Sequence, residues 1–204
     1  EHALPRLDPQ TGMAYGAQIR HALSPNREPR PASTPISLLV IHNISLPPGV
    51  FIGNAVEAFF LNQLDTRQHP YYQQLQSLTV SAHFFIRRHG EIIQFVPCCE
   101  KAWHAGKSCW KGQERCNDFS IGIELEGTDD SAYTTHQYHA LAALTAVLES
   151  VYPIVDRVGH CDIAPGRKTD PGRSFDWIHY TRLVEQKKIS LSVTLSSRSS
   201  KAAP

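Results

Sequence analysis

Four short apolar runs, separated by polar segments and turn residues, constrain the fold of this 204-residue chain most strongly. Each run is rich in β-branched or aromatic residues and is too short for an ordinary buried helix, which favours buried strands. The predicted strands span residues 36–42, 80–87, 92–96 and 120–125. The second and third are close in sequence, and His89-Gly90 between them predicts a tight turn.

Helical patterns alternate with these strands. Residues 54–64 predict a helix with Asn54 as its N-cap. Residues 135–151 carry apolar side chains at helical spacing and follow two threonines suited to capping. A further helix is expected over about 176–186, and the polar stretch 107–118 is expected to be a loop. Strands alternating with helices predict a single α/β domain with a central mixed sheet flanked by helices.

The ends of the chain differ in composition from its middle. Residues 1–35 contain six prolines and no long apolar run, so an irregular N-terminal arm is expected. Residues 188–204 end in a serine-rich stretch, SSRSSKAAP, which predicts a disordered tail. The folded domain is therefore expected to span residues 36–187.

Composition and charge exclude several classes of function. Lysine plus arginine number 20 against 19 aspartate plus glutamate, so no nucleic-acid partner is expected. No apolar stretch is long enough to span a membrane, and no feature implies an obligate protein partner. Five cysteines, an odd number without a Cys-x-x-Cys spacing, predict free thiols and a cytoplasmic location.

The chain contains 11 histidines, a number that directs attention to metal sites. His42 ends the first predicted strand, and His160 and Asp170 lie in GHCDIAPGRKTDPG at residues 159–172. A hydrolytic zinc ion takes three His or carboxylate ligands and keeps one open position. Each of the three residues alone also has an ordinary structural or solvated explanation. Cys161 is a poor additional ligand, because neighbouring side chains in an extended segment point apart.

Longer motifs single out one family. They are VIHNISLPPG at 40–49, SAHFFI at 81–86, AWHAG at 102–106, ERCNDFSIGIELEGTD at 114–129 and GHCDIAPGRKTDPG at 159–172. In this order they resemble the AmpD branch of the zinc amidase family, over roughly residues 36–180. The resemblance implies cleavage of the amide bond between N-acetylmuramic acid, preferably in its 1,6-anhydro form, and L-alanine, during peptidoglycan recycling. A small muropeptide is the implied substrate, and Zn²⁺ at one edge of the sheet is the implied cofactor.

The resemblance also implies roles for individual residues. The implied zinc ligands are His42, His160 and Asp170, and the implied catalytic residues are Glu124 and Lys168. The implied substrate contacts are Asn43, Tyr71, Trp103 and Arg115.

The chemistry of these side chains suits the implied roles. Glu124 shares a strand face with Gly122 and Glu126, so Glu126 is a rival for the proton-transfer role. In an extended segment, Lys168 and Asp170 would point to the same side, which places a cation near the metal. The nearby histidines His83 and His104 are not expected to be ligands.

Two other functions remain open at this point. Some peptidoglycan recognition relatives keep the groove, lose the metal and only bind. A carboxylate at position 170, together with Glu124 and Lys168, argues instead for catalysis. Hydrolysis of a different amide on the same metal site is the second alternative, and it would differ only in the shape of the pocket.

Overall fold

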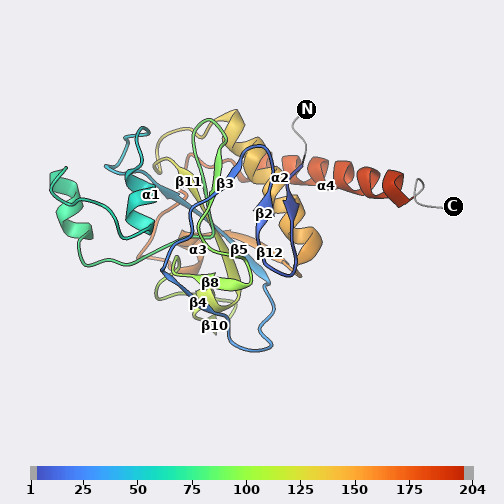
Figure 1. Ribbon diagram of the computed structural model, residues 1–204, viewed down its shortest axis with the longest axis horizontal. Helices are drawn as coiled ribbons and strands as arrows, with labels where there is room; N and C mark the ends of the chain where they lie inside the picture. The colour runs from blue at the N-terminus through green and yellow to red at the C-terminus, as the bar shows by residue number, and fades with distance from the viewer. Residues whose placement is uncertain (1–3, 200–204) are drawn as a thin grey trace.

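A mixed six-stranded sheet forms the centre of the computed structural model, which describes residues 4–199 and side chains through Val193 (Figure 1). The strand order is β12-β5-β11-β6-β7-β3, and only the β6–β7 pair is antiparallel. The sheet strands are β3 (Ile19–His21), β5 (Leu38–Ile44), β6 (Phe84–Ile86), β7 (Ile92–Gln94), β11 (Ser120–Glu126) and β12 (Asp156–Gly159). This architecture confirms the predicted α/β domain.

Helices α2 (Thr135–Val151) and α4 (Trp177–Ser199) pack against each other and against one face of the sheet. Thr134 caps α2 through a reciprocal capping box with Gln137, as the sequence predicts. Alternate residues Leu39 and Ile41 of β5 point into this helix-covered layer. The opposite face therefore receives Leu38, Val40 and, next in the alternation, His42.

Smaller elements complete the domain around the sheet. They are α1 (Ala55–Phe60), α3 (His160–Ile163), the 3-10 helices η1 (Pro70–Leu75) and η2 (Cys116–Asp118), and the short strands β1 (Arg6–Leu7), β2 (Ala14–Tyr15), β4 (Arg27–Pro29), β8 (Glu100–Ala102), β9 (Cys109–Trp110) and β10 (Gln113–Glu114). Strands β9 and β10 form a hairpin inside the segment predicted to be a loop. Asn54 precedes α1 without a side-chain capping bond.

The predicted irregular arm over residues 1–35 is wrong in part. Its segments form four short strands, of which β3 joins the central sheet beside β7 and β4 pairs with β8. Each is only two or three residues long, so no periodicity marks it in the sequence. The described structure thus ties much of this segment into the domain.

The predicted disordered tail over 188–204 is also wrong in part, because α4 continues to Ser199. No glycine or proline interrupts residues 177–199, so nothing in the sequence ends the helix earlier. In Figure 1 the last turns of α4 extend past the rest of the molecule. Residues 200–204 lie outside the described part of the chain.

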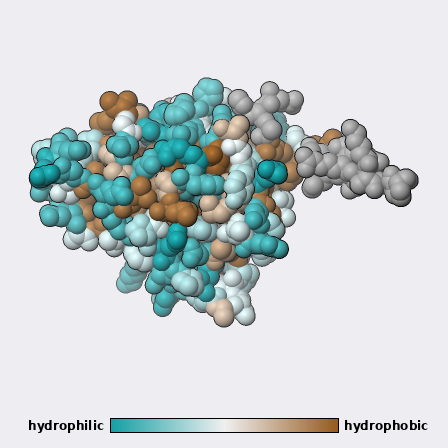
Figure 2. All heavy atoms as spheres, viewed as in Figure 1, coloured by the Kyte–Doolittle hydropathy of each residue, from teal (hydrophilic) through white to brown (hydrophobic). Residues whose placement is uncertain are grey.

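Within the described range, no helix is both long and apolar enough to cross a bilayer. The face shown in Figure 2 is mostly hydrophilic and carries separate apolar patches rather than one continuous apolar area.

Candidate metal and catalytic site

Strand register brings the first two candidate residues together. Strands β5 and β11 run parallel over seven residues, and this register pairs His42 with Glu124. Strand β12 lies on the other side of β5 and pairs Gly159 with Ile41, so His160 follows at the carboxyl end of the edge strand. Carboxyl ends of neighbouring parallel strands are a common location for binding sites in α/β sheets.

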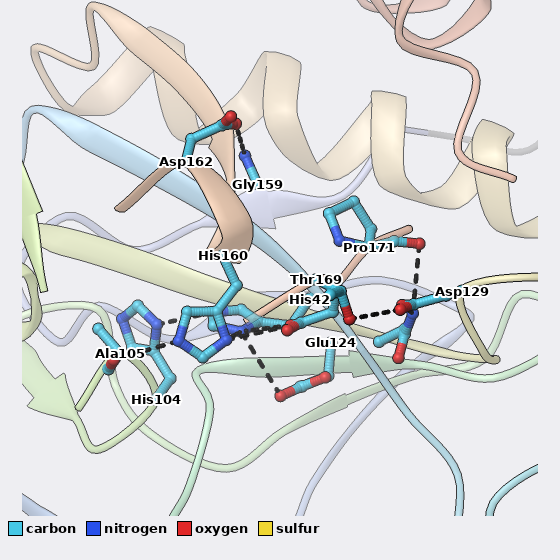
Figure 3. Close-up of polar contacts among 12 residues, drawn as sticks. His42, His104, Ala105, Glu124, Asp129, Gly159, His160, Asp162, Thr169 and Pro171 are labelled. Atoms are coloured by element: carbon cyan, nitrogen blue, oxygen red, sulfur yellow. Dashed lines mark hydrogen bonds and ion pairs between the residues drawn. The ribbon is translucent and has the colours of Figure 1, made fainter. Parts of the chain in front are cut away.

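Three donor atoms converge at this point (Figure 3). His42 Nδ1 lies 3.0 Å from His160 Nδ1, and Asp170 Oδ2 lies 3.2 and 3.1 Å from these two nitrogens. Zinc bonds of about 2.0–2.1 Å in a tetrahedral site would place donor atoms roughly 3.3 Å apart. The triangle therefore has nearly the size that a tetrahedral zinc ion needs. Among the described residues this is the single group of three such side chains placed to hold a metal.

The proton on His160 supports a cation at this point. Its Nε2 lies 3.1 Å from the carbonyl oxygen of Ala105, which can only accept, so Nε2 carries a proton. In the neutral imidazole, the lone pair of Nδ1 then faces the carboxylate of Asp170. Two lone pairs at this distance repel each other, and a positive charge between them would remove that repulsion. The donor set thus fits a bound divalent cation.

Burial sets the charge states of the histidines around the site. It lowers the pKa of His42 to about 4, although the hydrogen bond to Asp170 opposes this change. Burial, reinforced by the neighbouring imidazoles, lowers the pKa of His104 well below its ordinary value. Both rings are therefore neutral near pH 7, which is the form that donates a lone pair.

The two carboxyl groups have opposite pKa shifts. Burial opposes ionisation of Asp170, but hydrogen bonds to His160 and His42 outweigh it and lower the pKa. Burial raises the pKa of Glu124 well above its ordinary value, and the charge of Asp170 adds to the rise. Glu124 Oε1 lies 3.9 Å from His42 Nδ1, and Oε2 has no hydrogen-bond partner within the described structure. Glu124 is thus a buried carboxyl group with one unpartnered oxygen beside the candidate metal position.

Glu126, the rival for this role, is already used elsewhere. It accepts hydrogen bonds from the Arg87 side chain at 3.2 Å and from the Arg88 backbone at 2.9 Å. It does not line the cleft at the candidate metal centre, whereas Glu124 does. Of the two carboxylates on this face of β11, only Glu124 faces the site.

The loop with the third ligand is fastened to β5 and to the loop after β11. Asn43 Nδ2 donates to Asp129 Oδ1 at 2.8 Å and to the Pro171 carbonyl at 3.2 Å, and Thr169 Oγ1 also donates to Asp129. Gly172 has a φ of +79°, and a Cβ there would lie 2.2 Å from the Asp129 Cα. The close approach of the two loops thus requires glycine at this position.

The site opens into a cleft of about 580 Å³. The predicted residues Asn43, Tyr71, Trp103 and Lys168 all line it, together with the three candidate ligands and Glu124. Lys168 is exposed, and its charge counteracts the rise in the Glu124 pKa. Arg115 is not among the lining residues. It is largely exposed and pairs with Asp118 at 3.3 Å.

Other residues at the site were not predicted from sequence. His104 contacts His42, the Ala105 carbonyl holds His160, and Asp129 holds the loop that carries Asp170. The AWHAG motif contains the first two, but its histidine is 62 residues from His42, and no spacing in the sequence indicates their contact.

Comparison with known proteins shows the same fold and the same family. Residues 32–173 match the N-acetylmuramoyl-L-alanine amidase family. The 1,6-anhydro-N-acetylmuramyl-L-alanine amidase AmpD of Citrobacter freundii is 55% identical over 82% of this chain and 91% of its own length. AmpD of Escherichia coli (strain K12) is 52% identical over 87% of this chain and 97% of its own.

Solved structures agree. A crystal structure of a Se-Met AmpD derivative superposes with a TM-score of 0.83 and 53% identity, covering 87% of this chain and 98% of that one. A complex of Escherichia coli AmiD with anhydro-N-acetylmuramic acid-L-Ala-D-gamma-Glu-L-Lys superposes with a TM-score of 0.54 and 30% identity, covering 88% of this chain and 65% of that one. The chain therefore belongs to the N-acetylmuramoyl-L-alanine amidase family.

Proposed function

We propose that this protein is a zinc-dependent amidase that cleaves the bond between N-acetylmuramic acid and L-alanine in soluble muropeptides. We further propose that it prefers the 1,6-anhydro form and acts in the cytoplasm during peptidoglycan recycling. The observation that carries the proposal is the convergence of three metal-donor atoms beside a buried carboxylate. The relatives named above support the substrate, since they are 1,6-anhydro-N-acetylmuramyl-L-alanine amidases.

His42, His160 and Asp170 would hold the zinc ion. Bound there, zinc would supply Lewis acidity, which lowers the pKa of a water molecule from near 16 to about 7 and polarises a carbonyl group. Two neutral imidazoles and one carboxylate leave the site a net positive charge, which favours both effects.

Glu124 would carry the proton. Its unpartnered Oε2 can accept a proton from the attacking water as the water oxygen bonds to the amide carbon. As the carbon–nitrogen bond breaks, the same carboxyl returns the proton to the departing nitrogen, which leaves as the amino group of L-alanine. A pKa raised by burial suits a group that must both accept and release a proton near neutral pH.

Lys168 would stabilise the negative charge that forms on the carbonyl oxygen. It lies in the loop two residues before Asp170 and lines the same cleft. A cation placed where charge develops lowers the barrier without binding the ground state more tightly. Asn43, Tyr71 and Trp103 line the cleft as candidate substrate contacts, with Trp103 held by an indole hydrogen bond to Glu28 at 3.2 Å. Arg115 does not line the cleft, so it would contact a peptide carboxylate only if the substrate extended beyond the lining residues.

The direct test is mass spectrometry of purified anhydromuropeptides after incubation with zinc-loaded protein. We expect free peptide with an L-alanine amino terminus, together with anhydro-N-acetylmuramic acid. His42→Ala and Asp170→Ala should lose zinc in metal analysis, and zinc-replete variants would refute the ligand assignment. Digestion of intact sacculi at a comparable rate would contradict the proposed preference, and uncleaved muropeptides would leave a protein that only binds.

A further inference from the structure

His104 lies directly behind the candidate ligand His42. Its Nδ1 is 2.8 Å from His42 Nε2 (Figure 3). Its Nε2 is 2.9 Å from Ser120 Oγ. The ring is buried, and it contacts Nε2 of His42, whereas the other converging donor atoms lie around Nδ1. His104 is therefore too far behind His42 to be a ligand, but it is hydrogen-bonded to one.

The direction of these hydrogen bonds decides whether His42 can bind a metal. A neutral histidine that donates its Nδ1 lone pair must carry its proton on Nε2. The atom placed to accept that proton is His104 Nδ1, which requires His104 to carry its own proton on Nε2 and donate it to Ser120 Oγ. If the bonds ran the other way, the proton on His42 would sit on Nδ1, facing His160 and Asp170, and would block the site.

The backbone around His104 is shaped to hold this ring in place. A Cβ at position 122 would lie 2.4 Å from His104 Cγ, so the ring rests on the bare backbone of Gly122. Asn117 Oδ1 accepts from the amides of His104 and Ala105 at 3.2 and 2.9 Å. Because the Ala105 carbonyl holds His160, two adjacent residues on one anchored segment contact both candidate histidine ligands.

We propose that His104 is a positioning residue that keeps the Nδ1 lone pair of His42 free for the metal, and that residues 104–105 together orient both histidine ligands. Groups that hydrogen-bond to metal ligands typically change metal affinity or activity 10–100-fold when removed. The inference rests on the metal site of the proposed function, but it requires nothing of the substrate.

A matched pair of variants separates hydrogen bonding from packing. Leucine and asparagine are nearly isosteric, but only asparagine places an acceptor oxygen two bonds from Cβ, where the imidazole has Nδ1. The Zn²⁺ affinity of each purified protein is measured by competition with a chromophoric chelator. We expect His104→Leu to lower this affinity roughly 10–100-fold and His104→Asn to keep most of it. Equal affinity of the two variants, at any level, would overturn the proposal.

A second readout reports the tautomer itself. The ¹⁵N shifts of the His42 imidazole in zinc-loaded protein distinguish a protonated Nε2 from a deprotonated one. We expect a protonated, hydrogen-bonded Nε2 in the wild type and in His104→Asn, and loss of that hydrogen bond in His104→Leu. An unchanged Nε2 signal in His104→Leu would overturn the proposal.

Two further variants keep the test decisive. His83→Asn alters a buried imidazole that also contacts Gly122 but no candidate ligand, so it should bind zinc as the wild type does. A loss of affinity there equal to that of His104→Leu would point to packing alone and overturn the proposal. If His104→Leu does not fold, Ser120→Ala removes the acceptor for His104 Nε2, and wild-type zinc affinity in that variant would overturn it. Failure of the wild type to bind zinc would instead refute the proposed function.

Discussion

Acid should destabilise this protein through His83, a buried histidine outside the candidate site. Its Nδ1 accepts from the Gly122 amide at 3.1 Å and its Nε2 lies 2.9 Å from the Glu100 carbonyl, so both nitrogens are already used. A proton added to Nδ1 would break the bond to Gly122. It would also place a positive charge on a ring whose Nε2 lies 3.2 Å from the guanidinium of Arg30. Burial, with the charge of Arg30, lowers the pKa of His83 to about 3.

The size of the effect follows from the difference between the folded and unfolded pKa values. An unfolded histidine titrates near 6.5, so below that pH the unfolded chain binds a proton that the folded protein does not. The folded state therefore loses stability as pH falls from about 6.5 towards 3, by roughly 1.4 kcal/mol per pH unit. Between about pH 7.5 and pH 5, His83 alone accounts for a loss of about 2 kcal/mol.

Urea unfolding of the wild type and His83→Asn at these two pH values measures this contribution. Asparagine keeps an acceptor near the position of Nδ1 but has no titrating group, so the variant should lose about 2 kcal/mol less on acidification. Metal binding and the other histidines contribute equally to both proteins and cancel in the comparison. An identical loss in both proteins would show that His83 does not titrate between the folded and unfolded states in this range.

Three further predictions concern the site and the cysteines. Lys168→Met should lower kcat on the order of 10² to 10³ while zinc content stays at the wild-type level, and a near-normal kcat would make Lys168 a bystander. Gly122→Ala would force a Cβ against the His104 ring and should lower the free energy of unfolding by about 1–3 kcal/mol in urea titrations. Wild-type stability would mean that the ring moves aside freely. All five cysteines are free, so denatured, unreduced protein should titrate as five thiols, and a value near one would indicate two disulfides.

Elements with a strong local signal could be predicted from the sequence. The helix over 135–151 has the expected bounds, because its apolar spacing and its threonine cap are both local features. Strand β5 begins and ends within two residues of its prediction, since a buried parallel strand is apolar on both faces. The two- and three-residue strands of the N-terminal segment carry no such pattern, because only pairing makes them strands: β1 pairs with β2, β3 with β7 and β4 with β8.

The same distinction between local and non-local features applies to the candidate site. His42, His160 and Asp170 come from recognisable motifs, and the structure brings their donor atoms together. The contact of His104 with His42 depends on how the 102–106 segment crosses β11, which no local pattern encodes. The one sequence feature related to this contact is Gly122, whose missing side chain makes room for the His104 ring. A single glycine in a strand has several possible explanations, so it does not predict the contact.

The seven-residue pairing of β5 with β11 couples the register of the sheet to the placement of two candidate site residues, His42 and Glu124. A shift of one residue in either strand would turn His42 or Glu124 towards the helix-covered layer and bury a charged or polar group among apolar side chains. A folded sheet with a misaligned histidine and carboxylate is therefore strongly disfavoured. Core packing alone keeps His42 and Glu124 on the same face of the sheet. The loop that carries Asp170 depends instead on its hydrogen bonds to Asn43 and Asp129 and on the close approach of Gly172 to Asp129.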